Sequence, residues 1–164
     1  MTAIKQVPDA AMIWPSGNSP AESGVFAQNV IEVRAKPETV WSLLVDCAKW
    51  PRWYRHCADV SILRDGSTLR EHSKFRFKTL NLYFEPEVTV FEPQRMLVWF
   101  AKGPLGSSGA HAWRIEPIRD GCRVITEETQ RGIPSRLLGW HTRKRLLLAH
   151  QDWLEGLKEM AEGG

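Results

Sequence analysis

The sequence contains few cysteines, and they lack the spacing of a metal site. Cys47, Cys57 and Cys122 are the only ones among the 164 residues, and no two of them form a CxxC pair. An odd number of cysteines without such a pair favours free thiols in a reducing compartment over a disulfide framework or a zinc site. We therefore predict neither a disulfide nor a bound metal.

Long apolar runs are also absent. No stretch approaches the ~20 apolar residues that a transmembrane helix needs. Residues 1–14 lack the basic start and the apolar run of a signal peptide. Both absences predict a protein of the cytoplasm.

A charge excess of one sign is missing too. The chain has 22 basic and 19 acidic residues, which gives a net charge of +3. No long basic stripe carries interleaved aromatic residues, so we predict no nucleic-acid partner. The one local excess is Arg143–Arg145, with Arg131 and Arg136 upstream. This cluster has two interpretations: contact with anionic lipid or an acidic partner, and a solvated helix face.

The common catalytic and cofactor motifs do not occur. The serines have no GxSxG elbow, the histidines form no HExxH or His-x-His pair, and no GxGxxG or P-loop is present. These absences argue against serine acyl transfer, zinc chemistry and dinucleotide binding. We predict no cofactor.

The composition is that of one globular domain with unusually many tryptophans. Hydrophobic residues make up 43% of the chain and charged residues 25%, and eight residues are Trp. Such a surplus suits a lined pocket or an interface, and a Trp-rich core is the other interpretation. Proline and glycine concentrate in residues 1–24, which predicts an extended or disordered arm before a domain at 25–164.

The domain begins with a strand at residues 25–34, because its residues alternate between apolar and polar. Pro37 then opens a short helix, and residues 46–53 form a second helical turn. Three hairpins follow, turning at Asp65-Gly66, near Thr79-Leu80 and at Asp120-Gly121.

Each turn implies a register. The first pairs Ile62 with Leu69, and the second pairs Phe77 with Leu82. The third pairs Trp113 with Glu128 and would place Glu127 on a wet outward face. Between the last two hairpins, a strand at 95–102 ends in a Gly- and Ser-rich loop, which is either a lid or a plain connector.

The last element is a long helix from Pro134 to about Glu162. Its apolar residues share one broad face at 100° per residue. His150 lies near the centre of that face, and Arg143 lies close to it. The face comprises Trp140, Leu146, Leu147, Trp153, Leu154, Leu157, Met160 and Ala161.

The order of strand, two short helices, six antiparallel strands and one long helix resembles the helix-grip fold of the START-like or SRPBCC superfamily. The segments Ile31–Trp41, Trp50–Trp53, Gly109–Trp113 and Asp120–Val124 resemble its polyketide cyclase/dehydrase branch. Over residues 25–162 this resemblance implies an α+β fold, in which a curved seven-stranded antiparallel sheet wraps the helix around a cavity. The superfamily contains carriers, sensors and cyclases, so the resemblance specifies the fold more than the chemistry.

Polar side chains on the inward faces are the candidate site. His111 and Glu128 form the acid–base pair if the protein is an enzyme, and each is otherwise a structural or ligand-orienting group. Glu128 and Glu71 need a cation or water, and Arg143 and His150 are the available cations. The predicted ligand-binding set is Glu71, Ser73, Phe75, Phe77, Phe84, Trp99, His111, Trp113, Thr126, Glu128, Trp140, Arg143, Leu147 and His150.

Three functions fit these residues. The favoured one is a carrier or sensor of a small hydrophobic ligand such as a lipid, polyketide or isoprenoid. The second is a cyclase or dehydratase that acts on a poly-carbonyl substrate. The third is a quinone- or lipid-handling protein that touches membranes transiently through its basic helix start and Trp140. A monomer and a homodimer remain equally open.

Overall fold

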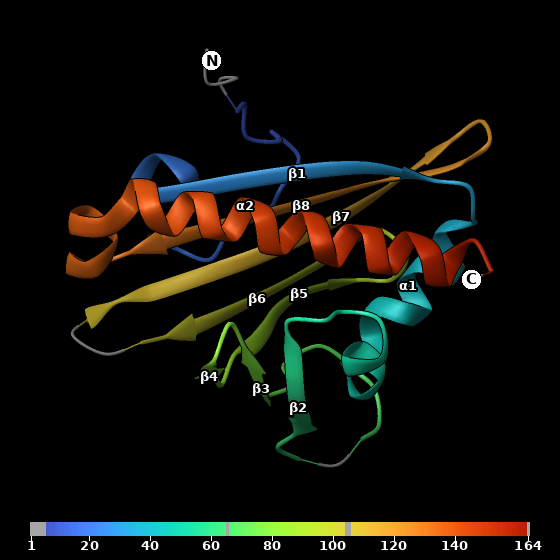
Figure 1. Cartoon of the computed structure of the whole chain (residues 1–164), viewed down its shortest axis with the longest axis horizontal. Coiled ribbons are helices and arrows are strands. Elements are labelled where there is room, and N and C mark those ends of the chain that lie inside the picture. Colours follow the sequence, from blue (N-terminus) through green and yellow to red (C-terminus); the bar gives the residue numbers. More distant parts are fainter. Residues whose placement is uncertain (1–5, 65, 104–105, 164) are drawn as a thin grey trace.

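One long helix lies across an antiparallel sheet in the computed structural model of the chain (Figure 1). The structure describes residues 6–64, 66–103 and 106–163, with the side chains of residues 134–136 and 138 excepted. In chain order the elements are η1 (Pro20–Glu22), β1 (Val25–Val33), α1 (Pro37–Val45), η2 (Cys47–Arg52), β2 (Cys57–Ile62), β3 (Phe75–Thr79), β4 (Leu82–Phe84), β5 (Glu87–Glu92), β6 (Met96–Lys102), β7 (Ser108–Ile118), β8 (Gly121–Arg131) and α2 (Ile133–Ala161).

The strands form two antiparallel sheets. The larger has the order β1-β8-β7-β6-β5, and the smaller has the order β2-β3-β4. An isolated bridge between Lys74 and Glu87 joins them. The predicted α+β helix-grip fold is confirmed, but the described residues form eight strands in two sheets rather than seven in one. Pro86 explains the break between β4 and β5, because proline has no N–H to donate to a strand ladder.

The first predicted hairpin is wrong. Ile62 pairs with Phe75 instead of Leu69, and the Leu63 N–H donates to the Lys74 carbonyl. Leu69 is buried, and its N–H donates to the carbonyl of Val45 at the end of α1. The segment after β2 is therefore a long loop, because Leu69 reaches the core through α1 rather than by pairing with its neighbour in sequence.

The other two hairpins exist, with registers two residues away from those predicted. Phe77 pairs with Phe84 across a turn at Leu80-Asn81, whose φ angles are 50° and 66°. In the β7–β8 hairpin, His111 pairs with Glu128 and Trp113 pairs with Thr126. A shift of two residues leaves every side chain on its predicted face. It also places His111 directly opposite Glu128.

The N-terminal segment lies on the face of the large sheet opposite α2. Met12 is buried there against an apolar cluster made by Met96, Val98, Ala112 and Ile125. Glu127 faces outward as predicted, but it is fully buried rather than wet. Its Oε1 accepts hydrogen bonds of 2.7 Å from the Asp9 backbone N–H and from Gln28 Nε2. Burial raises the pKa of Glu127.

The main core fills the space between the large sheet, α1, η2 and the second half of α2. Trp50 of η2 lies at its centre and makes edge-to-face contacts with Phe75, Phe77 and Trp153 at ring-centroid distances of 5.1–5.8 Å. Its indole N–H donates to the Leu44 carbonyl at 3.1 Å. This core holds α2 in a fixed position over β7 and β8.

Candidate functional site

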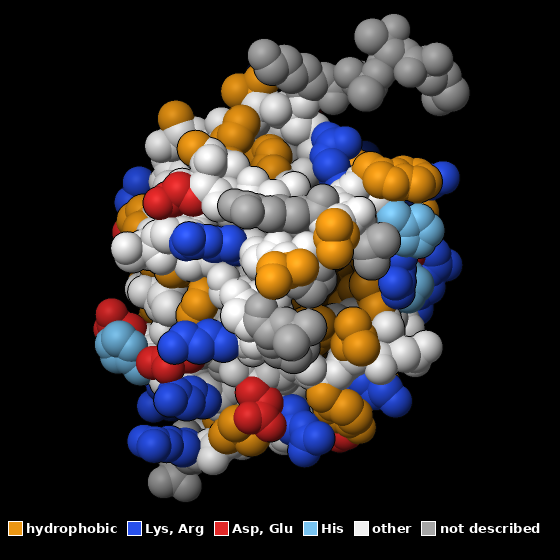
Figure 2. Space-filling view, turned by 90° about the vertical axis from the view of Figure 1, so that its left-hand side faces the viewer, with side chains coloured by type: hydrophobic (Ala, Val, Ile, Leu, Met, Phe, Trp, Pro, Cys, Tyr) orange, Lys and Arg blue, Asp and Glu red, His pale blue; other side chains and the backbone are white. Residues whose placement is uncertain are grey.

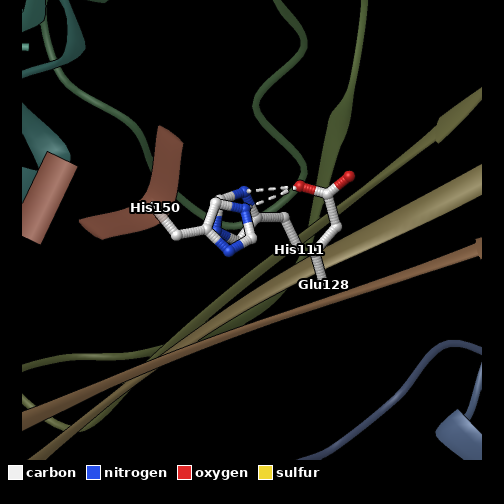
Figure 3. A group of neighbouring side chains, drawn as sticks. All are labelled: His111, Glu128 and His150. Atoms are coloured by element: carbon white, nitrogen blue, oxygen red, sulfur yellow. Dashed lines mark hydrogen bonds and ion pairs between the residues drawn. The ribbon is translucent and has the colours of Figure 1, made fainter. Parts of the chain in front are cut away.

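Three polar side chains meet where α2 crosses the centre of the sheet (Figure 3). His111 and Glu128 are opposite each other on β7 and β8, and His150 comes from α2. Glu128 Oε2 lies 3.0 Å from His150 Nε2 and 3.6 Å from His111 Nδ1. The two imidazole rings stack with centroids 4.7 Å apart. The structure thus joins three of the predicted residues into one buried cluster.

Burial and mutual contacts determine the charges of this cluster. Burial alone would raise the pKa of Glu128, but the hydrogen bonds that the carboxylate accepts from His150 and Gln130 favour its ionised form and bring that pKa below its ordinary value. Burial and the neighbouring His150 together lower the pKa of His111 to about 3, although Glu128 acts in the opposite direction. At neutral pH the cluster therefore holds an ionised Glu128 beside an uncharged His111.

The hydroxyl of Thr126 fixes the orientation of the His111 ring. Thr126 Oγ1 lies 2.7 Å from His111 Nε2, and both side chains are buried. With the ring proton on Nδ1, His111 presents an N–H to the Glu128 carboxylate and accepts from the Thr126 hydroxyl. The uncharged imidazole then has a hydrogen bond at Nε2, while the 3.6 Å from Nδ1 to Glu128 Oε2 is a longer electrostatic contact.

Aromatic rings surround His111 on the side of the main core. The ring centroids of Trp99, Trp113 and Trp153 lie 4.9, 5.1 and 5.3 Å from that of His111. Phe75 and Phe77 continue this packing toward Trp50. These residues were predicted to line an open space, but here they touch one another. This part of the seam between sheet and helix is core rather than cavity wall.

Access to the cluster is through Glu128. Its side chain is 17% exposed, whereas those of His111 and His150 are 6% and 3% exposed. Gln130 Nε2 donates to the other carboxylate oxygen of Glu128 at 2.8 Å. The Glu128 side chain is therefore the partly exposed member of the cluster, and the two imidazoles are more deeply buried.

Buried polar atoms near this cluster lack partners among the described residues. Trp113 Nε1, Trp153 Nε1 and His150 Nδ1 have no hydrogen-bond partner among the described residues. The Trp113 and Trp153 rings contact each other at 5.1 Å, and each also contacts His111. A buried polar group without a hydrogen bond costs about 1–3 kcal/mol. The two indole N–H groups thus leave unused hydrogen-bond donors in the packed interior beside the cluster.

Several predicted site residues lie elsewhere. Glu71 is exposed on the loop before β3, and Ser73 accepts a hydrogen bond from the Arg70 N–H in the same loop. Trp140 is 77% exposed on the outer side of α2, so its predicted inward placement is wrong. It lies at the edge of the broad apolar face, where a small rotation of the helix turns a side chain outward.

Three further predicted residues stabilise the fold without joining the cluster. Arg143 Nε donates to the Phe26 carbonyl at 2.9 Å, and its Nη2 donates to Gln6 Oε1 at 2.9 Å. Of the two predicted partners for Glu128, the structure selects His150 over Arg143. Leu147 is half-buried against Val25 and Ala27, while Phe84 packs on Phe77 with centroids 5.9 Å apart.

Tyr54 was missed by the sequence analysis. Its ring stacks on Trp153 at 4.2 Å with an interplanar angle of 2°, and its hydroxyl lies 3.1 Å from Thr79 Oγ1. Burial raises the pKa of Tyr54, so the hydroxyl stays protonated. Tyr54 follows Pro51 in an irregular segment without periodicity, and no sequence pattern indicated that it faces inward.

His111, Glu128 and His150 are also a potential donor set for a divalent cation. One donor atom of each lies within 4.8 Å of the others. Imidazole and carboxylate suit zinc and similar ions. However, His150 Nδ1 has no acceptor among the described residues to orient the ring as a ligand. The absence of a metal stays a prediction from the sequence.

The chain is similar to a family model over residues 27–162, and the family is described as polyketide cyclase / dehydrase and lipid transport. The chain belongs to this family. No curated protein matches it. The predicted relationship to the polyketide cyclase branch of the START-like superfamily is confirmed.

Solved structures with similar folds support the same fold class. A hypothetical protein of Helicobacter pylori, jhp0584, is 26% identical with a TM-score of 0.84, and the match covers 95% of this chain and 99% of that one. StfQ, a di-domain ARO/CYC protein of the steffimycin biosynthetic pathway, is 17% identical with a TM-score of 0.70; the match covers 84% of this chain and 50% of StfQ. The Aha1 protein of Colwellia psychrerythraea is 18% identical with a TM-score of 0.63, over 85% of this chain and 98% of that one.

Proposed function

We propose that the protein binds a small, largely apolar ligand whose polar end reaches Glu128. The observation that carries the proposal is the partly exposed, ionised Glu128 side chain at the edge of an interior in which two indole N–H groups have no partner among the described residues. Lipid transport in the family description agrees with a binding role. The packed aromatic rings mean that the ligand lies beside the exposed edge of Glu128 rather than along the whole helix.

The charges of the site restrict the ligand. A carboxylate only accepts hydrogen bonds when ionised, so the ligand offers a hydroxyl or another neutral donor to Glu128. A ligand carboxylate or phosphate would be repelled at this position. A carbonyl on the same ligand would accept from an indole N–H. Hydroxylated polyketides, isoprenoid alcohols and neutral lipids have this combination of groups.

The first experiment is native mass spectrometry of the purified protein, which detects a co-purifying apolar molecule. The second is a titration of tryptophan fluorescence with naphthol, naphthalene and naphthoate, because Trp99, Trp113 and Trp153 lie next to the cluster. We expect naphthol to bind most tightly and naphthoate most weakly. Equal affinity for all three probes would overturn the role of Glu128.

A matched pair of variants tests the site. Glu128→Gln keeps the size of the side chain but removes its charge, and we expect about tenfold weaker naphthol binding, since hydrogen bonds to charged groups contribute roughly 1.5–3 kcal/mol. Naphthalene binding should not change. Trp140→Phe is the control, because Trp140 is exposed on the far side of α2, and it should leave both affinities unchanged.

A second candidate function is an acid–base enzyme, favoured by the contact between Glu128 and His111. Efficient general bases have a pKa near the working pH. The pKa of both groups lies below the neutral range instead, and this is why we rank binding first. Turnover of a poly-carbonyl substrate that His111→Gln abolishes, with thermal stabilisation by the substrate retained, would reverse this ranking.

A further inference from the structure

The outer side of α2 carries a row of exposed apolar side chains in its first half. Ile133, Leu137, Trp140 and Leu148 are 63%, 74%, 77% and 61% exposed. At 100° per residue they lie on one side of the helix, opposite the buried Leu146, Trp153 and Leu157. A single exposed apolar residue is ordinary, but four large ones in one row are typical of an interaction surface. We call these four residues the α2 stripe.

The charge on this side of α2 changes sign along the helix. Lys144 and Arg145 are exposed beside the α2 stripe. Beyond Leu148 the same side carries the exposed Glu155 and Glu159, while Asp152 is paired with Arg55 and His56 and Lys158 is paired with Glu162. An anionic surface would attract the first half of the helix and repel the second half. The partner that fits is therefore an anionic surface, and it meets the first half of α2 rather than the second.

A basic pocket adjoins the stripe. It measures about 310 Å³ and lies between α2 and the turn that joins β3 to β4. Its lining residues are Arg55, His56, Ala58, Lys78, Leu80, Asn81 and Arg145. Asp152 contacts Arg55 and His56 at 2.6 Å each and so neutralises one charge. Lys78 and Arg145 form no ion pair within the described part of the chain, which leaves the pocket positive.

The hairpin beyond the pocket presents further apolar side chains. Leu82 and Tyr83 of β4 are 58% and 49% exposed. Lys78 lies over the Tyr83 ring at 5.4 Å. Figure 2 shows the end of the molecule at which α2 begins, where hydrophobic side chains lie beside Lys and Arg side chains. Apolar groups flanked by cations are what the interface of an anionic bilayer binds.

We propose that the α2 stripe and the basic pocket dock the protein onto membranes that contain anionic phospholipids. The stripe enters the headgroup region, and the pocket takes the phosphate of one lipid. Among the described residues no helix is both long and apolar enough to cross a bilayer, so the contact is peripheral. The surface lies on the opposite side of α2 from Glu128, and either proposal can fail without the other.

The test is flotation of the full chain with vesicles of phosphatidylcholine, alone or mixed with phosphatidylglycerol. We expect binding to the mixed vesicles and little binding to phosphatidylcholine alone. Leu137→Ser should weaken binding at least about tenfold, because an exposed leucine gains about 1.5–3 kcal/mol on transfer from water. Leu63→Ser is the matched control, since Leu63 is 46% exposed outside this surface, and it should bind like the parent.

Two further measurements test the role of the basic pocket and the insertion of the α2 stripe into the membrane. Arg145→Glu should lower binding to the mixed vesicles and leave weak binding to phosphatidylcholine unchanged, which identifies the pocket. Membrane insertion of Trp140 should shift the fluorescence to the blue in the parent and not in Trp140→Phe. Equal binding to both vesicle types would overturn the proposal, and so would a dimer, seen by analytical ultracentrifugation, that Leu137→Ser dissociates.

Discussion

The carboxylate of Glu128 accepts a hydrogen bond from Nε2 of His150 at 3.0 Å, and this bond joins the last strand to the last helix. The two residues are 22 positions apart in the chain. The bond lies between the main core at one end of α2 and the exposed α2 stripe at the other. The bond orients the helix over the sheet, and its acceptor, Glu128, lies at the edge of the candidate site.

The first prediction is that Glu128 and His150 are energetically coupled. Glu128→Gln and His150→Gln should each destabilise the fold by about 2 kcal/mol, because each leaves a buried polar partner unsatisfied. The double variant should be less destabilised than the sum, by roughly 0.5–3 kcal/mol. Urea unfolding of the four proteins measures this coupling. Strict additivity would show that the bond contributes nothing to stability.

The second prediction concerns pH. The pKa of His111 is about 3 in the fold and about 6.5 in the unfolded chain. Between these values the unfolded chain binds more protons, so stability rises with pH. We expect the free energy of unfolding to fall as the pH is lowered from about 6.5 toward 3.

The lowered pKa of Glu128 acts in the same direction at the acid end. Glu128 contributes to stability above the pKa of 4.5 that it has in the unfolded chain. This contribution is lost as the pH falls through the lower pKa that Glu128 has in the fold. His111→Gln should therefore flatten the pH dependence near pH 6 and keep the steeper loss below pH 4.5. Urea unfolding at a series of pH values tests this, and an unchanged slope near pH 6 in the variant would contradict it.

The sequence alone was sufficient for the order of the main elements and for the faces that point inward. Strand residues alternate with a period of two, so a register error of two residues left His111, Trp113 and Glu128 on the correct face. The register itself could not be derived. Asp120-Gly121 was taken as the two-residue turn, whereas the turn residues are Arg119 and Asp120, and Gly121 begins β8 with a φ of 148°.

Long-range packing explains the other differences. Leu69 was assigned to a strand because it follows Asp65-Gly66, but its N–H bonds to Val45. The segment before β1 has no periodic pattern, so nothing in the sequence indicated that Met12 would bury Val98 and Ile125. Glu127 was predicted to be exposed to solvent because the sequence did not indicate that this segment covers it. Leu69 and Val45 are 24 positions apart, and the contacts of Met12 and Glu127 join residues more than 80 positions apart; local patterns do not encode either kind.

The third prediction follows from that N-terminal segment. Met12→Ala should destabilise the protein by about 2–3 kcal/mol, because the side chain is 7% exposed and covers Met96 and Val98. Ile13→Ala is the neighbouring control, since Ile13 is 45% exposed, and it should cost little. Thermal unfolding compares the two. Equal small effects would show that the segment contributes no stability to the sheet.

The fourth prediction concerns the contact between α2 and η2. A Cβ added at Gly156 would lie 2.0 Å from the Trp53 carbonyl oxygen, so Gly156 is what lets the helix approach the chain after η2 so closely. Gly156→Ala should destabilise the fold by roughly 1–3 kcal/mol, because the backbone must move to relieve the overlap. Gly139→Ala in the same helix is the comparison: its Cβ would lie 3.3 Å from the Gly24 carbonyl oxygen, which needs a shift of only a few tenths of an ångström, and the gain of up to about 1 kcal/mol in helix propensity offsets that strain. If thermal unfolding finds both variants equally stable, the close approach at Trp53 does not fix the position of α2.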